Sequence, residues 1–316
     1  MKTKVYFASD LHGSNLCFRK FVNAGKFYGA NVLILGGDVT GKTIVPMVRM
    51  GDGTVRVRER GTDRSLKSQS EVEEVSKSLG DAGSYPYVAD RKEFEELEAK
   101  PELVVGLFKR LMTETLRSWI RLADERLGGT EIKCYVSPGN DDFFEIDEVL
   151  SSGKHLTNPE GRVVEIDGQH EMITLGYTNR TPWNSPREVG EDILQEKIDG
   201  MVAGVKSMET VIFNLHVPPI DTPIDQALKL DENLKPIVSG GDPVMVSAGS
   251  MAVQGSIERY QPLVGLHGHI HESRGMVQIG RTMCFNPGSE YASGILKGVL
   301  LDLEDDVVKS YLLTSG

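Results

Sequence analysis

The chain has 316 residues, of which 39% are hydrophobic and 26% are charged. This length and apolar content allow it to bury a sizeable core, as one large domain or two. Its net charge of −11 disfavours nucleic acid as a partner, because nucleic-acid sites need a basic footprint, and it also disfavours anionic membrane surfaces. The composition therefore favours an acidic globular protein.

Targeting and cysteine signals predict a cytoplasmic protein with no membrane association. The opening residues Met1–Lys4 lead directly into an expected strand and show no signal-peptide cleavage site. Apolar runs stay well short of the roughly 20 residues of a membrane span. Cys17, Cys134 and Cys284 lie in apolar stretches, which is typical of reduced core thiols rather than disulfides. A cysteine nucleophile is the less favoured alternative.

Apolar patterning predicts alternating strands and helices in the first half of the chain. Short aliphatic and β-branched runs bounded by Gly, Pro or Asp are typical of buried strands, and apolar residues at helical spacing mark the connecting helices. In chain order these elements are a strand at 5–9, a helix at 15–28, a strand at 32–37, crossover helices at 91–127 with a kink or a helix restart at Pro101, and a strand at 132–136.

Residues 43–90 break this rhythm and are predicted to form an insertion that shields the site. Within it, residues 54–60 alternate like a two-faced strand, residues 70–79 have a helical pattern, and residues 85–87 are typical of a turn with exposed aromatics. The basic run 56–60 is interpreted as a solvated face, with contact to an anionic substrate as the alternative.

The second half predicts more strands and helices around one long loop, within a single domain spanning 1–316. The loop at 217–248 is rich in Pro, Gly and Asp, and loops of this length are usually functional or mobile. The expected elements are hairpin strands at 163–166 and 172–175, a helix at 188–208, a strand at 211–215, a helix at 250–260, a strand at 263–266, and tail strands around 283, 299 and 308–311 that close a second sheet.

Five of the predicted strands are followed by side chains that can bind a metal ion. In open α/β sheets, chemistry gathers at the carboxyl ends of the strands, so these side chains are expected to meet. They offer too many O and N donors for one ion and about the right number for two. The candidates are Asp10, His12, Asp38, Asn140, His216, His269 and His271.

Each candidate also has an ordinary structural interpretation. A single Asp at a strand end is most often a helix cap or turn residue, and a single His is most often a hydrogen-bonded core residue. Turn chemistry does not, however, require the Asp10-x-His12 and His269-x-His271 patterns directly after apolar runs. Together with the other donors, these patterns favour a metal site.

These motifs, in this order, resemble those of the calcineurin-like metallophosphoesterases. The segments 266–273 and 286–291 are most similar to the branch related to bacterial cyclic-AMP phosphodiesterase. The resemblance implies a four-layer α/β/β/α sandwich and two divalent ions, and the mixed donors suit Mn, Fe, Zn or Co. By this resemblance one ion takes Asp10, His12, Asp38 and His271, and the other takes Asp38, Asn140, His216 and His269, with Asp38 bridging.

The implied activity is hydrolysis of a small phosphodiester or phosphomonoester by a metal-activated hydroxide that attacks phosphorus. Asn140, Asp141 and His216 are the candidate catalytic residues. The family usually has His after Gly-Asn, as a proton donor for the leaving group, whereas this chain has Asp141. Four alternatives follow. Asp141 is protonated in place, or Asp142 or a metal-bound water helps the leaving group, or the substrate has a leaving group that needs little help, or Asp141 is simply a turn residue or helix N-cap.

The sequence leaves open the roles of two other residues and two alternative functions. His267 is either a support for the metal ligands or a core residue, and Arg180 is a candidate phosphate contact. A non-catalytic scaffold that binds protein partners is the alternative function, kept open by the missing His. A nuclease is the third option, weakened by the acidity of the chain. The sequence also leaves a homo-oligomer open.

Overall fold

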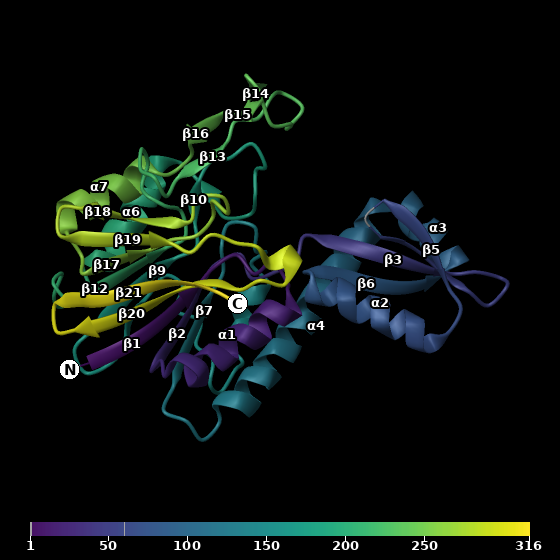
Figure 1. The fold of residues 1–316 in the computed structure, drawn as a ribbon, viewed down its shortest axis with the longest axis horizontal. Coiled ribbons are helices and arrows are strands. Elements are labelled where there is room, and N and C mark those ends of the chain that lie inside the picture. The colour runs from purple at the N-terminus through teal and green to yellow at the C-terminus, as the bar shows by residue number, and fades with distance from the viewer. Residues whose placement is uncertain (1, 60) are drawn as a thin grey trace.

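The computed structural model describes residues 2–59 and 61–316. Met1, the first residue of the opening segment, and Arg60, the last residue of the predicted strand at 54–60, lie outside the described residues. Two large sheets form the body of the protein (Figure 1). The first contains β1 (Lys2–Ala8), β2 (Val32–Gly36), β7 (Lys133–Ser137), β20 (Lys297–Glu304) and β21 (Val307–Ser315), in the order β21-β20-β1-β2-β7. The second contains β8 (Val163–Glu165), β9 (Glu171–Leu175), β12 (Val211–Leu215), β17 (Val264–Leu266), β18 (Gly275–Ile279) and β19 (Thr282–Asn286), in the order β18-β19-β17-β12-β9-β8.

The alternation of side chains along β1 explains how the layers form. Val5 and Phe7 belong to the core between the two sheets, whereas Tyr6 and Ala8 belong to the core beneath the helices on the other face. Successive residues of a strand point to opposite faces, so an apolar run fills both cores at once. The strands β1, β2 and β7 run parallel, so their carboxyl ends lie at one edge.

Helices cover the outer face of each sheet. The first sheet packs against α1 (Asn15–Tyr28) and α4 (Pro101–Leu127), with Phe18 and Trp119 stacked at 4.2 Å between ring centroids. The short helix α5 (Ile146–Leu150) packs on α4. The second sheet packs against α6 (Glu191–Val202) and α7 (Met251–Tyr260). The predicted four-layer α/β/β/α sandwich is therefore confirmed.

Local signals set the ends of the two long helices as predicted. The Ser14 side chain accepts the N–H of Cys17 at the start of α1, and Gly29 ends the helix with a left-handed φ of 64°. Pro101 occupies the first turn of α4, where its missing N–H costs nothing, so the predicted restart is confirmed.

Residues 43–99 form a separate lobe to one side of the sandwich (Figure 1). Its sheet has the order β5-β4-β3-β6 and its own apolar core beneath one helix. The predicted strand at 54–60 and helix at 70–79 are present, although the Arg60 end of the former is not described. The elements of the lobe are β3 (Thr43–Arg49), β4 (Val55–Glu59), β5 (Thr62–Leu66), α2 (Gln69–Asp81), β6 (Ser84–Asp90) and α3 (Arg91–Ala99), which contacts β3 and β6.

Two predictions about the chain's elements were wrong. Residues 85–87 are not a turn but part of β6, and Tyr85 is only 3% exposed. Pro86 is tolerated there because β6 is an edge strand. The tail strands do not all close the second sheet: β20 and β21 extend the first, with β20 antiparallel to β1.

The second half of the chain otherwise follows the predicted order. The helix expected at 188–208 is shorter, and the loop 217–248 contains small strand pairs. The short elements are β10 (Thr178–Asn179), β11 (Glu188–Val189), β13 (Gln226–Leu228), β14 (Val238–Ser239), β15 (Asp242–Pro243), β16 (Met245–Ser247) and the 3-10 helix η1 (Tyr291–Ser293). Among residues 2–59 and 61–316, no helix combines the length and apolar character that crossing a bilayer requires.

Candidate metal centre

All seven predicted ligands lie close together, at the edge where the carboxyl ends of the parallel strands of both sheets meet. The loops after β1, β2 and β7 bring residues from the first sheet, and those after β12 and β17 bring residues from the second. His216 ties the two edges together, because its Nδ1–H donates to the carbonyl of Gly36 at 2.8 Å. Five of the seven side chains are almost fully buried, and His269 and His271 are half-buried.

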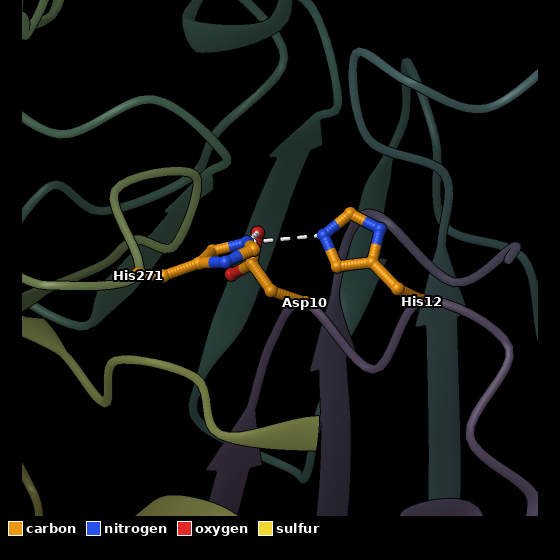
Figure 2. A group of neighbouring side chains, drawn as sticks. All are labelled: Asp10, His12 and His271. Atoms are coloured by element: carbon orange, nitrogen blue, oxygen red, sulfur yellow. Dashed lines mark hydrogen bonds and ion pairs between the residues drawn. The ribbon is translucent and has the colours of Figure 1, made fainter. Parts of the chain in front are cut away.

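The first group of ligands is Asp10, His12 and His271, which come from two distant parts of the chain (Figure 2). The Nε2 atoms of His12 and His271 lie 3.0 Å apart, and the Nε2 of His271 lies 3.4 Å from Oδ1 of Asp10. Two nitrogens bound at right angles to one ion at about 2.1 Å would lie about 3 Å apart, so this spacing suits a shared cation.

The second group is Asp38, His216 and His269. His216 Nε2 lies 3.4 Å from Oδ1 of Asp38, and it is buried without a hydrogen-bond partner among the described residues. Asn140 joins this group, because its Oδ1 lies 2.9 Å from Nδ1 of His269. A buried imidazole nitrogen without a partner is costly unless something binds it, and a metal ion meets that need.

Asp38 lies between the two groups. Its Oδ1 faces His216, while its Oδ2 lies 3.6 Å from Nε2 of His12 in the first group. The carboxylate therefore faces both sets of donors, which is the position that the predicted bridging role requires. The role itself stays a prediction.

The loops that carry the ligands have unusual backbone conformations. Asp10, His12, Asp38 and His269 all have left-handed φ values, of 58°, 40°, 49° and 67°. Such conformations in residues other than Gly are uncommon and cluster at functional sites. Gly139 is equally constrained, because a Cβ there would lie 2.2 Å from Oδ1 of Asp38.

The electrostatics of the group suit metal ions. Burial lowers the pKa of His12, and it lowers the pKa of His269 to about 3, so both rings are held in the neutral form that binds metals. Burial also opposes charge on His216, but the Asp38 carboxylate outweighs it and raises the pKa of His216 to about 10. The buried carboxylates thus call for a positive charge, which divalent ions can supply. The residues present fit a pair of such ions.

A surrounding set of hydrogen bonds holds these ligand loops. The Nδ1–H of His267 donates to the carbonyl of Leu215 at 2.8 Å, so this buried residue supports the loop of His216. Asp142 accepts the backbone N–H groups of Val39, Thr40 and Gly139. Asp142 therefore braces the loops of Asp38 and Asn140 and is not free to assist a leaving group.

Asp141 lies beside the centre as a carboxylate held by three side chains. Lys42 Nζ lies 2.5 Å from its Oδ2, and Ser185 Oγ and Asn140 Nδ2 donate to its Oδ1 at 2.5 and 3.1 Å. Burial alone would raise the pKa of Asp141, but Lys42 outweighs it and lowers this pKa to about 2. This environment speaks against a protonated Asp141.

Four residues near the centre escaped the sequence analysis. Lys42 and Ser185 hold Asp141, and the Tyr291 ring lies 4.8 Å from that of His12. Arg187 is buried, with Nε donating to the carbonyl of Asp142 at 2.9 Å. Tyr291 could have been found from the sequence, because it ends the segment 286–291 that resembles the metallophosphoesterases. Lys42, Ser185 and Arg187 belong to no recognisable motif. Arg180, the predicted phosphate contact, is exposed.

The cysteines take no part in this centre. Cys17, Cys134 and Cys284 are buried free thiols. Burial raises the pKa of all three, to about 12 for Cys134 and Cys284, so they lack the thiolate character of a nucleophile. The expectation of core thiols is confirmed.

Comparison with known proteins supports the fold more strongly than any activity. No family model matches the chain. The uncharacterized protein MJ1162 of Methanocaldococcus jannaschii is 30% identical over 159 residues, which are 50% of this chain and 63% of that protein. The chain thus spans less than two thirds of the length of this relative.

Solved structures align with the whole chain. One has a TM-score of 0.58 at 17% identity, and TT1561 of Thermus thermophilus has 0.54 at 13%; each alignment covers 100% of this chain and 99% of the other. The phosphoesterase Yfce of E. coli is among the weaker likenesses, with a TM-score of 0.32 and 13% identity over 98% of both chains. The chain therefore shares its four-layer fold with the first two of these structures.

Proposed function

We propose that this protein is a dinuclear-metal-dependent phosphoesterase that hydrolyses a small phosphodiester or phosphomonoester. The observation that carries the proposal is the meeting of two buried ligand groups at Asp38. Each group offers nitrogen and oxygen donors within 4.8 Å of one another. A structural role for one strand-end Asp or His would not require a second group of donors next to the same carboxylate.

The two ions, when bound, supply Lewis-acid activation of water and of the phosphoryl group. The chain's own residues hold and orient them. Asp10, His12 and His271 would hold one ion, Asn140, His216 and His269 would hold the other, and Asp38 would serve both. His216 is fixed by its bond to the carbonyl of Gly36, so this ligand of the second sheet is held against the edge of the first. We propose Mn, Fe, Zn or Co as the metal, and the cytoplasm as the location.

Asp141 has a different part from the proton-donating His that the family usually carries. Because it is held as a carboxylate by Lys42 and Ser185, we infer that it positions its neighbours rather than protonating a leaving group. This leaves the enzyme best suited to esters whose leaving group departs with little help.

The test is hydrolysis by the purified chain after chelation and after readdition of Mn. Bis-p-nitrophenyl phosphate and p-nitrophenyl phosphate report diester and monoester activity. We expect chelation to abolish activity and Mn to restore it in the wild type. His269→Asn should stay inactive, while the matched variant His155→Asn, at an exposed position, should behave as wild type.

A fully metal-loaded chain that hydrolyses neither ester would contradict the proposal and favour the non-catalytic scaffold. Hydrolysis that survives complete removal of metal would equally contradict it. Activity on single-stranded or duplex DNA exceeding that on small esters would favour the nuclease.

A further inference from the structure

A lysine from the base of the lobe lies beside the candidate metal centre. Lys42 directly precedes β3, and its neighbours are fixed: Gly41 donates its N–H to the Tyr85 hydroxyl at 2.7 Å, and Thr43 pairs with Ser84 of β6. A Cβ on Gly41 would lie 2.3 Å from the carbonyl of Gly83, so the lobe packs directly against this turn. The lobe therefore fixes the point from which the Lys42 side chain extends.

The Lys42 ammonium is directed at the centre and is still open to solvent. It pairs with Asp141 at 2.5 Å, and its side chain is 47% exposed. The Asp141 carboxylate in turn lies in one group with donor atoms of His12 and Asp38, all within 4.8 Å of one another. The ammonium thus stands one carboxylate away from the predicted bridging ligand, and its side chain remains accessible to solvent.

The arrangement holds Asp141 in place and leaves Lys42 with donors to spare. Ser185 and Asn140 donate to one carboxylate oxygen, and the backbone N–H of Asp141 donates to Asp38 at 3.0 Å. An ammonium has three donors, and Asp141 needs one of them. A lone carboxylate here would repel an anionic ester, whereas the pair with Lys42 does not.

We propose that Lys42 contacts a terminal oxygen of the substrate phosphate and favours phosphomonoesters over phosphodiesters. The proposal rests on the proposed function and narrows its substrate class. A phosphomonoester dianion offers three terminal oxygens and two negative charges, whereas a diester offers two oxygens and one charge. A hydrogen bond from an ammonium to phosphate is charge-assisted, so the dianion gains more from it. Asp141 and Ser185 act as positioning residues for Lys42.

The first test is calorimetric binding of inorganic phosphate to the Mn-loaded full chain, with metal content measured for each variant. Lys42→Gln should weaken phosphate binding by about tenfold or more. Lys206→Gln is the matched control, because Lys206 also pairs with a carboxylate, that of Glu171 at 3.3 Å. Glu171 begins β9, at the end of the strand away from the metal centre. The control variant should bind phosphate as the wild type does.

A double-mutant cycle with Asp141→Asn distinguishes a direct contact between Lys42 and the phosphate from neutralisation of Asp141 by Lys42. If Lys42 touches the phosphate, Lys42→Gln should still weaken binding in the Asp141→Asn background, although by less than in the wild type because Asp141 no longer positions the ammonium. If Lys42 serves only to neutralise Asp141, its loss should have no effect once Asp141 is uncharged, and the proposal is then overturned. Phosphate affinity within twofold of wild type in Lys42→Gln would overturn it too.

The second test compares kcat/KM for p-nitrophenyl phosphate and bis-p-nitrophenyl phosphate. The monoester-to-diester ratio should fall by about tenfold in Lys42→Gln, chiefly through KM, and Lys42→Arg should recover part of it because the charge is kept. An unchanged ratio in an active enzyme overturns this inference alone. Absence of any hydrolysis by the metal-loaded wild type refutes the proposed function, while the phosphate-binding cycle still decides the role of Lys42.

Discussion

Replacing Asp38 with Asn removes a negative charge from both ligand groups while keeping the size of the side chain. The Asp141 N–H donates to Oδ1 of Asp38 at 3.0 Å. The amide oxygen of the introduced side chain should therefore take the Oδ1 position, facing His216, and its NH₂ should take the Oδ2 position, facing His12. The first group, which contains His12, then faces an NH₂ group where it had a carboxylate oxygen. The second group, which contains His216, still faces an oxygen, although an uncharged one.

Both ions should bind more weakly in Asp38→Asn, and the ion of the first group should suffer more. Changes to residues that merely support metal ligands typically cost 10–100-fold in affinity, so loss of a shared ligand should cost at least about 100-fold. After dialysis against a weak chelator, metal analysis should find two ions per chain in the wild type and fewer than one in the variant. His271→Ala, which removes a ligand of the first group alone, should retain about one.

Hydrolysis of p-nitrophenyl phosphate should fall with metal content. Two tightly bound ions per chain in Asp38→Asn, at wild-type affinity, would refute the bridging role and the ligand assignment built on it. Circular dichroism of each variant checks that the fold is intact.

Three further outcomes follow from the structure. Gly139→Ala should lower metal content and activity, because the new Cβ would lie 2.2 Å from Oδ1 of Asp38, whereas Gly200→Ala, with open space around the site, should be silent. In the metal-free protein, Asp141 has a pKa lowered to about 2, so its ionised form should add about 2 kcal/mol to the unfolding free energy above pH 4 and lose it as pH falls through 2. Urea unfolding of Asp141→Asn should thus converge with wild type at low pH, and a constant difference would contradict the ion pair. Replacing residues 43–90 by a Gly-Ser linker should leave metal content near wild type in a folded product, since every predicted ligand lies outside that range; loss of both ions would contradict this.

The ligand set could be predicted because each member directly follows an apolar strand. Phe7 and Ile34 mark buried parallel strands by their pattern, and parallel strands place their carboxyl ends together. No long-range contact had to be known to expect that Asp10 and Asp38 would meet. The helix of residues 15–28 could be predicted because helical spacing of apolar residues is a local pattern in the sequence.

Pairing between distant strands was beyond the same reasoning. The apolar pattern of β20 shows that the strand is buried, but it does not show that Phe7 pairs with Val299 rather than with a strand of the other sheet. The contact of Lys42 with Asp141 was missed for a related reason, because the two residues lie on loops far apart in the sequence and charged loop residues are usually solvated. Residues 85–87 were predicted as a turn because proline is rare inside strands. Only the sheet order shows that β6 is an edge strand, where Pro86 is tolerated.

The left-handed backbone at Asp10, His12, Asp38 and His269 has a consequence for choosing substitutions at the centre. Asn and Asp adopt this conformation more readily than other residues with a side chain, because their short polar groups bond locally. Alanine at these positions would lose a ligand and also strain or refold the turn, with a cost of the order of 1–3 kcal/mol. An alanine scan would therefore overstate each side chain's share in metal binding. Asparagine instead separates the loss of the carboxylate charge or the imidazole nitrogen from the distortion of the loop.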